Sequence, residues 1–220
     1  DHQIPSKWST THAGAYYLCE DTDLVAIADS NPLALQKFQD KWQIKKGYLD
    51  YREMIENEQI DILSICAPTG FHYDIFKCSI DSAIKAIYLE KPLSNDLGEA
   101  RNMVRLGEQT IVSVNYFRRW NTTISNVVSD IKTNVYGKGM HATVHYNKGI
   151  LLNGSHFIDL ICWIWGDPLS VKYLRTTKDD SIDPAVDFSL QFKDDLIVYF
   201  LNIPNLNYNF AQIDILLERS

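Results

Sequence analysis

Glu90, Lys91 and Pro92 follow an apolar segment that has the character of a strand. A lysine at the end of a strand that borders a cleft can donate a hydrogen bond to a hydroxyl or carbonyl oxygen. Glu90 beside it could hold or position the ammonium group. A cis Lys91–Pro92 bond would fix the direction of the lysine side chain. The alternative is an ordinary strand end with a surface lysine.

His156 and Asp159 lie three residues apart in a helical segment, so they share a face with Trp163. Gly154 and Ser155 precede them. A histidine near the start of a helix can accept a proton during catalysis. The alternative is a partly buried, hydrogen-bonded histidine on an otherwise apolar helix.

Asp29 ends the short apolar run 24–28. A carboxylate in this position can accept two hydrogen bonds from an adenosine ribose, and it repels a 2′-phosphate. Ser30 and Asn31 follow without an arginine, so the pattern favours NAD over NADP if a dinucleotide binds. The alternative is an aspartate that caps a helix or closes a turn.

Two further segments follow predicted strand ends. The backbone of residues 68–72 could face a cofactor, with His72 capping the next helix, or it could form a plain strand-to-helix turn. Arg118 and Arg119 could bind a phosphate or carboxylate of a substrate, or they could pair with the acidic surface of the protein.

The elements that must position these residues alternate between strand and helix in the first half of the chain. This alternation predicts βαβ units and a parallel sheet, in which ligands bind beyond the carboxyl ends of the strands. The predicted strands are 24–28, 61–67, 86–89 and 111–116, and the predicted helices are 10–20, 33–42, 51–56, 73–82 and 94–106, the last with Ser94 as its N-cap.

The second half has a different pattern, which predicts an α+β domain with an open, mostly antiparallel sheet. We place the boundary near Arg119, so that a Rossmann-type parallel-sheet domain spans 1–119 and the α+β domain spans 120–220. Its predicted helices are 120–133 and 155–165, and its strands are 141–146, 170–175, 186–192, 196–202 and 210–217, with a hairpin turn at 193–195.

Composition narrows the classes of partner. The 21 basic and 28 acidic residues give a net charge of −7, which argues against nucleic acid or an anionic membrane as the main partner. The four cysteines form no CxxC pair and are typical of reduced thiols, so we predict a cytoplasmic protein. The most apolar stretch, 150–165, is interrupted by polar residues, so we predict no transmembrane helix. Residues 1–5 do not show the basic start and apolar core typical of a signal peptide. His141 and His145 lack a third ligand nearby, so we predict no metal site.

A dinucleotide-binding domain usually opens with a strand and a G-x-G-x-x-G turn. The ten glycines of this sequence never form that pattern. We therefore expect that the chain is a fragment: its first domain is incomplete at the N-terminus and its second at the C-terminus.

Taken in order, the segments 24–29, 61–72, 90–93, 114–119 and 154–160 resemble the glucose–fructose oxidoreductase / inositol dehydrogenase (Gfo/Idh/MocA) family. Its most specific marks here are Glu90-Lys91-Pro92 and the G-x-H-x-x-D pattern from Gly154 to Asp159. The resemblance implies an N-terminal Rossmann domain, and a C-terminal domain whose open sheet commonly forms a dimer or tetramer interface. It also implies an NAD(H) or NADP(H) cofactor, with sugars, sugar nucleotides or cyclitols as substrates.

On this resemblance, Lys91 would bond to the reacting oxygen and His156 would exchange the proton as hydride moves. Together with the strand-end positions, it predicts two sets of contacts. The cofactor set is Asp29, Ala67, Pro68, Thr69, His72, Glu90, Lys91 and Asn115, and the substrate set is Lys91, Arg118, Arg119, Asn153, His156 and Asp159.

One position departs from the family pattern. Many active members carry an aspartate four residues before the histidine, where this chain has Leu152, followed by Asn153. A leucine cannot orient an imidazole or relay a proton. The function predicted is an NAD(P)-dependent oxidoreductase, and two alternatives stay open: a non-catalytic dinucleotide or sugar sensor, and a lyase or hydrolase that oxidises its sugar transiently with bound NAD.

Overall fold

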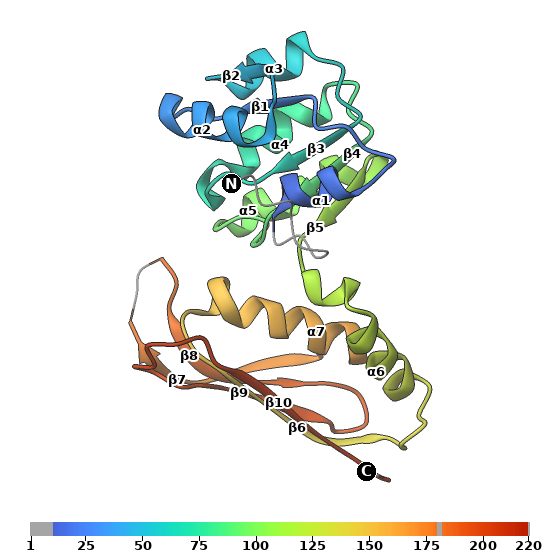
Figure 1. Cartoon of the computed structure of the whole chain (residues 1–220). Helices are drawn as coiled ribbons and strands as arrows, with labels where there is room; N and C mark the ends of the chain where they lie inside the picture. Colours follow the sequence, from blue (N-terminus) through green and yellow to red (C-terminus); the bar gives the residue numbers. More distant parts are fainter. Residues whose placement is uncertain (1–10, 180–181, 220) are drawn as a thin grey trace. The chain divides into compact units, whose positions relative to one another are not determined.

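A computed structural model describes residues 11–179 and 182–219 (Figure 1). The chain divides into two compact units, the first ending at Val114 and the second beginning at Asn115. The boundary expected at Arg119 falls within the second unit, in the short helix η3 (Phe117–Trp120). Tyr116 and Arg119 contact residues of the later helix α7 (Ser155–Trp165), which explains why this segment belongs to the second unit.

The first unit alternates strands and helices, as the buried apolar runs predict. Its strands are β1 (Ala26–Ala28), β2 (Lys46–Tyr48), β3 (Ile62–Ile65), β4 (Ala86–Leu89) and β5 (Ile111–Val114). Its helices are α1 (His12–Leu18), α2 (Pro32–Trp42), α3 (Tyr51–Asn57), η1 (Thr69–Phe71), α4 (His72–Ile80), α5 (Leu97–Leu106) and η2 (Gly107–Gln109).

All strand pairs of the first unit are parallel, but they form two sheets. One sheet pairs β1 with β2, and the other has the order β3-β4-β5. Both sheets contribute to one apolar cluster, in which Ala26 and Ala28 pack against residues that include Leu63 and Ile65. Among the described residues, no strand pairs with the second edge of β1 or of β3.

The start of α5 differs from the prediction. The N-cap is Asp96, whose carboxylate accepts the Glu99 backbone N–H at 2.8 Å, and Ser94 lies outside the helix. The Ser94 hydroxyl instead donates to the Glu99 side chain and accepts the Asp96 N–H. Both residue types are good caps, so the local pattern alone did not separate them.

The second unit is the predicted α+β arrangement. Its helices are η3, α6 (Thr122–Lys132), the π-helical turn η4 (Ile150–Gly154) and α7. Its strands are β6 (Gly139–Tyr146), β7 (Ser170–Lys178), β8 (Ala185–Gln191), β9 (Ile197–Asn202) and β10 (Ala211–Leu217). The sheet order is β10-β6-β9-β8-β7, with one parallel pair, β6 with β9.

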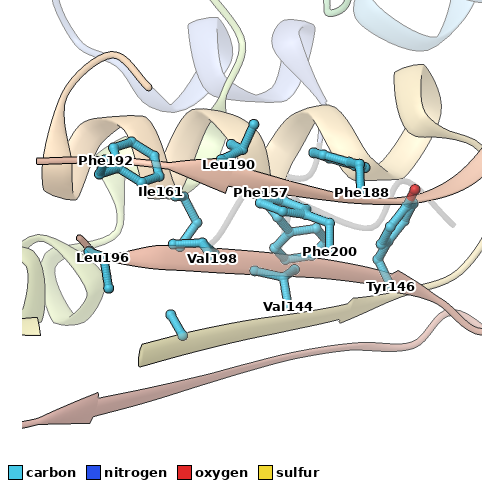
Figure 2. Close-up of a cluster of buried hydrophobic side chains, with 11 residues drawn as sticks. Val144, Tyr146, Phe157, Ile161, Phe188, Leu190, Phe192, Leu196, Val198 and Phe200 are labelled. Carbon is cyan, nitrogen blue, oxygen red and sulfur yellow. The ribbon is translucent and has the colours of Figure 1, made fainter. Parts of the chain in front are cut away.

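Helix α7 covers one face of this sheet. Figure 2 shows Phe157 and Ile161 of α7 lying over Val198 and Phe200 of β9, and both helix residues belong to the main buried cluster of the unit. The turn between β8 and β9 is the predicted hairpin, in which Asp194 and Asp195 adopt left-handed backbone angles. The apolar face of α7 thereby anchors the helix that carries His156 near its start.

Candidate functional site

Lys91 lies just beyond the carboxyl end of β4. Glu90 continues the strand pairing, because its N–H donates to the Ile65 carbonyl at 2.9 Å. Glu90 Oε2 then accepts the backbone N–H of Lys91 at 3.3 Å. The Lys91–Pro92 bond is cis. The end of β4 therefore presents a half-buried lysine beside a carboxylate.

His12, in the first turn of α1, reaches Glu90, and sequence reasoning missed it. Its Nε2 lies 2.8 Å from Glu90 Oε1, and its Nδ1 lies 3.2 Å from Ser64 Oγ. Ser64 Oγ is also 2.7 Å from the Tyr16 hydroxyl. In the sequence, a single histidine in a short helix does not indicate a contact with Glu90, which lies 78 positions away. Only its place on the sheet-facing side of α1 brings it to β3 and β4.

Asp29 and the segment after β3 hold the other cofactor candidates of the first unit. Asp29 is exposed directly after β1, and its Oδ1 accepts the Asn31 backbone N–H at 2.8 Å. Ala67 and Pro68 form the turn that leads into η1, which begins at Thr69. Asp29 thus closes the turn before α2 and keeps its carboxylate at the surface.

His72 has a different place from the one predicted. It is the first residue of α4, it is only 1% exposed, and its ring nitrogens lie 2.8 Å from the Ala67 carbonyl oxygen and 3.0 Å from that of Pro92. The ring therefore joins the turn after β3 to the turn after β4. This enclosure gives His72 a structural role between the two turns, and its contact with a cofactor stays a prediction.

In the second unit, His156 lies in the first turn of α7 among aromatic side chains. Its half-buried ring meets the ring of Tyr116 edge-on at 5.8 Å and that of Phe117 at 5.3 Å. Burial raises the pKa of the Tyr116 phenol, and the Asp159 carboxylate adds to this shift. Tyr116 therefore stays protonated near neutral pH. Asn115, the remaining cofactor candidate, is half-buried at the start of this unit.

The two adjacent arginines differ in their partners. Arg119 binds Asp159 through three contacts of 2.9 to 3.0 Å, and its guanidinium lies over the Trp163 ring. Arg119 thus pairs with an acidic side chain of the protein, which is the alternative to substrate binding given above. The same ion pair occupies the Asp159 carboxylate. Because the two residues are 40 positions apart, the pairing depends on the packing of η3 against α7.

The Arg118 guanidinium lies against two aromatic rings, 4.7 Å from the ring centre of Phe117 and 4.6 Å from that of Phe157. Burial lowers its pKa. Its Nη1 atom is buried and has no hydrogen-bond partner within the described part of the chain. A buried, unpaired donor of this kind could bind an oxygen of a carboxylate or phosphate.

The turn before His156 is held by two polar contacts. Asn153 donates through Nδ2 to the Asn147 carbonyl at 2.9 Å, so its amide links the turn to the end of β6. Asp183 accepts the N–H groups of Leu151 and Leu152 at 2.6 and 3.1 Å. Leu152 itself is 51% exposed. A carboxylate thus lies at this turn, but it comes from the loop before β8.

Residues 11–179 and 182–219 contain no group of three or more His, Cys, Asp or Glu side chains arranged to hold a metal ion. His141 and His145 lie on the same side of β6, where His141 packs against the Tyr199 ring and His145 faces Asp214. No described helix is both long and apolar enough to cross a bilayer.

The fold and these strand-end residues define a class: a parallel-sheet domain of the Rossmann type, followed by an α+β domain that carries a helix-borne histidine. The family model described as an oxidoreductase family with an NAD-binding Rossmann fold, Gfo/Idh/MocA, matches residues 6–116. The chain belongs to this family, as the sequence marks indicated.

Individual relatives agree with this assignment. Myo-inositol 2-dehydrogenase of Thermotoga maritima is 26% identical over 132 residues, which are 59% of this chain and 39% of that protein. Glycosyl hydrolase family 109 protein 4 of Phocaeicola vulgatus is 29% identical over 97 residues, which are 40% of this chain and 19% of that protein. The matched stretches thus span less than half the length of these two relatives.

A solved structure shares the fold. Scyllo-inositol dehydrogenase from Lactobacillus casei, crystallised with bound NAD(H) and scyllo-inositol, has a TM-score of 0.80 against this chain. The match covers 95% of this chain and 70% of that one, at 15% sequence identity.

Proposed function

We propose that this chain is part of an NAD(P)-dependent oxidoreductase that moves a hydride between a nicotinamide and a hydroxyl-bearing carbon of a sugar, sugar nucleotide or cyclitol. The observation that carries the proposal is the end of β4, where Glu90 accepts the Lys91 backbone N–H at 3.3 Å and lies 2.8 Å from His12 Nε2. Family membership supports the same reaction class, and the named dehydrogenases among the relatives support a polyol substrate.

The nucleotide end of the cofactor fits the surface after β1. Asp29 is exposed there and Ser30 and Asn31 add no positive charge, which favours the ribose hydroxyls of NAD over the 2′-phosphate of NADP. No G-x-G-x-x-G turn occurs in the sequence, so we assign the pyrophosphate to no residue. When bound, the nicotinamide supplies the acceptor or donor of the hydride.

Lys91 and His156 divide the proton chemistry in this proposal. In the oxidising direction, the hydroxyl proton of the substrate passes to His156 while the carbon loses hydride, and Lys91 donates a hydrogen bond to the oxygen that becomes a carbonyl. Arg118 is the substrate contact best supported by its surroundings, because its Nη1 is buried without a partner in the described chain. In this proposal the other predicted substrate contacts stabilise the second unit through their own hydrogen bonds: Arg119 with Asp159, and Asn153 with the Asn147 carbonyl.

Replacement of Lys91 by methionine tests this proposal. We expect NAD-linked turnover of the best substrate in a panel of sugars and cyclitols to fall by about 10²- to 10⁴-fold, because a positioned proton donor contributes that much. The circular dichroism spectrum should be unchanged. Lys85→Met is the matched control, since Lys85 is exposed and its ammonium pairs with Asp61 at 2.6 Å, away from the end of β4. An unchanged rate in Lys91→Met would overturn the assignment.

A second candidate function is supported by one comparison. The similarity to a glycosyl hydrolase family 109 protein favours a hydrolase or lyase that oxidises its sugar transiently and regenerates bound NAD. Such an enzyme releases product with no net change in NADH absorbance. Product analysis by chromatography beside the absorbance assay therefore distinguishes the two reactions.

We also propose that copies of the protein assemble through the open face of the second sheet, and that the protein is cytoplasmic. Strand β7 is exposed along nearly its whole length, and Val171 and Tyr173 are 65% and 62% exposed. An apolar surface of this kind is typical of an interface. Sedimentation equilibrium of the protein would test the assembly.

A further inference from the structure

We propose that His12 is a positioning residue for Lys91 and acts through the Glu90 carboxylate; this rests on the role proposed for Lys91. His12 and Glu90 belong to different elements, yet His12 Nε2 lies 2.8 Å from Glu90 Oε1. The second carboxylate oxygen, Oε2, accepts the Lys91 backbone N–H at 3.3 Å. One carboxylate therefore joins α1 to the main chain of the lysine.

The hydrogen bonds around His12 can form one continuous chain of donors and acceptors. A carboxylate only accepts, so His12 Nε2–H donates to Glu90. Nδ1 of the neutral ring can then accept the hydroxyl proton of Ser64, at 3.2 Å. Ser64 Oγ can in turn accept the Tyr16 O–H, since the two hydroxyl oxygens lie 2.7 Å apart. Donors aligned in this way strengthen one another and fix the orientation of the imidazole.

The surroundings of this contact favour a fixed geometry. The His12 side chain is 16% exposed and the Glu90 side chain is 30% exposed. The His12 ring also packs on the Tyr88 ring, with 4.7 Å between the ring centres. Water therefore competes weakly with the imidazole for the carboxylate, and hydrogen bonds to a charged group are the stronger kind. Loss of the His12 donor is therefore expected to loosen the Glu90 carboxylate and weaken its bond to the Lys91 N–H.

Three variants separate the hydrogen bond from the packing of the ring. His12→Phe keeps a ring against Tyr88 but removes the donor. His12→Gln keeps an N–H donor but removes the ring. His141→Phe is the matched control, because His141 also packs on a tyrosine ring, that of Tyr199 at 5.7 Å, but lies in the second unit. Glu90→Gln is a further variant that removes the charge if His12→Phe does not fold.

Amide hydrogen exchange of Lys91, followed by NMR, is the measurement. We expect exchange about tenfold faster in His12→Phe, with partial recovery in His12→Gln and no change in His141→Phe. The Glu90 amide, which bonds to the Ile65 carbonyl, should keep its protection and shows that β4 is intact. Unchanged exchange at Lys91 in His12→Phe would overturn the proposal, and this readout needs no turnover.

Kinetics add a second readout wherever the wild-type protein is active. We expect kcat to fall about tenfold or more in His12→Phe, because the orientation of Lys91 at the reacting oxygen is lost. An unchanged kcat would overturn the role of His12. A wild-type protein that oxidises no substrate would count against the proposed function instead, and the exchange data would still decide the contact between His12 and Lys91.

Discussion

Tyr146 shows at the residue scale how burial sets the chemistry of one group. Its side chain is fully buried in the core of the second unit, and its hydroxyl donates to the Val186 carbonyl at 2.5 Å. Burial raises the pKa of this phenol to about 12, from an ordinary value of 10.0. The protonated form is therefore favoured by the folded state, and the unfolded chain loses its proton first.

This shift predicts a loss of stability in alkali. Because the folded pKa lies above the unfolded one, the stabilisation is complete below pH 10 and is lost as the pH rises toward 12, by up to about 2 to 3 kcal/mol. Urea unfolding of the second unit at pH 9 to 11.5 measures it. In Tyr146→Phe this part of the pH dependence should disappear. An equally steep loss in that variant would assign the effect to other groups.

The sequence could predict site residues that their local position marks, but not those whose partners lie far along the chain. Lys91 and His156 stand out because strand ends and helix starts are visible in the sequence. His12 and Asp183 do not, since each acts on a segment far along the chain, at Glu90 and at Leu152. The pairing of Arg119 with Asp159 likewise depends on packing, so the sequence left its two readings open.

At the element scale, the start of α7 depends on a carboxylate from another loop. The Asp183 side chain accepts two N–H groups of η4, and the Pro184 carbonyl accepts a third, from Ile150. A side chain at Gly149 would overlap the Asp183 carboxylate, which explains the glycine there. A carboxylate at this end also interacts favourably with the positive N-terminal end of the helix dipole.

We expect Asp183→Ala to destabilise the second unit by about 1 to 2 kcal/mol, since it removes a cap with two hydrogen bonds. Asp183→Asn keeps one acceptor and should lose about half as much. Urea unfolding followed by circular dichroism measures both. Asp179→Ala, at an exposed position near the end of β7, is the control. If Asp183→Ala were as stable as that control, the cap would have no measurable effect.

The elements themselves were predictable where burial leaves a pattern. The strands of the parallel sheets are short apolar runs, and α7 is apolar on its sheet-facing side. Strand β2 was missed because Lys46-Gly47-Tyr48 has no apolar alternation, and it forms only because β1 lies beside it. The helix at α5 was predicted but its cap was not, because two suitable residues lie two positions apart.

At the scale of the whole molecule, the parallel strands of the first unit are divided between two sheets. Parallel sheets are normally continuous and covered on both faces. Here β1 and β3 each lack a second paired neighbour within the described residues. Ile62, at the start of β3, is 44% exposed.

Unpaired strand edges are templates on which another chain can add a strand, and we predict that the edge of β3 left unpaired by the described residues promotes aggregation. A charge at the edge should oppose this. We expect Ile62→Lys to slow aggregation at 37 °C, measured by light scattering, relative to the wild-type protein. Leu97→Lys, at an exposed position of helix α5, is the control, because it adds the same charge away from both edges of the sheet. Equal slowing by both variants would point to net charge as the cause, and no slowing by Ile62→Lys would exclude β3 as the aggregation site.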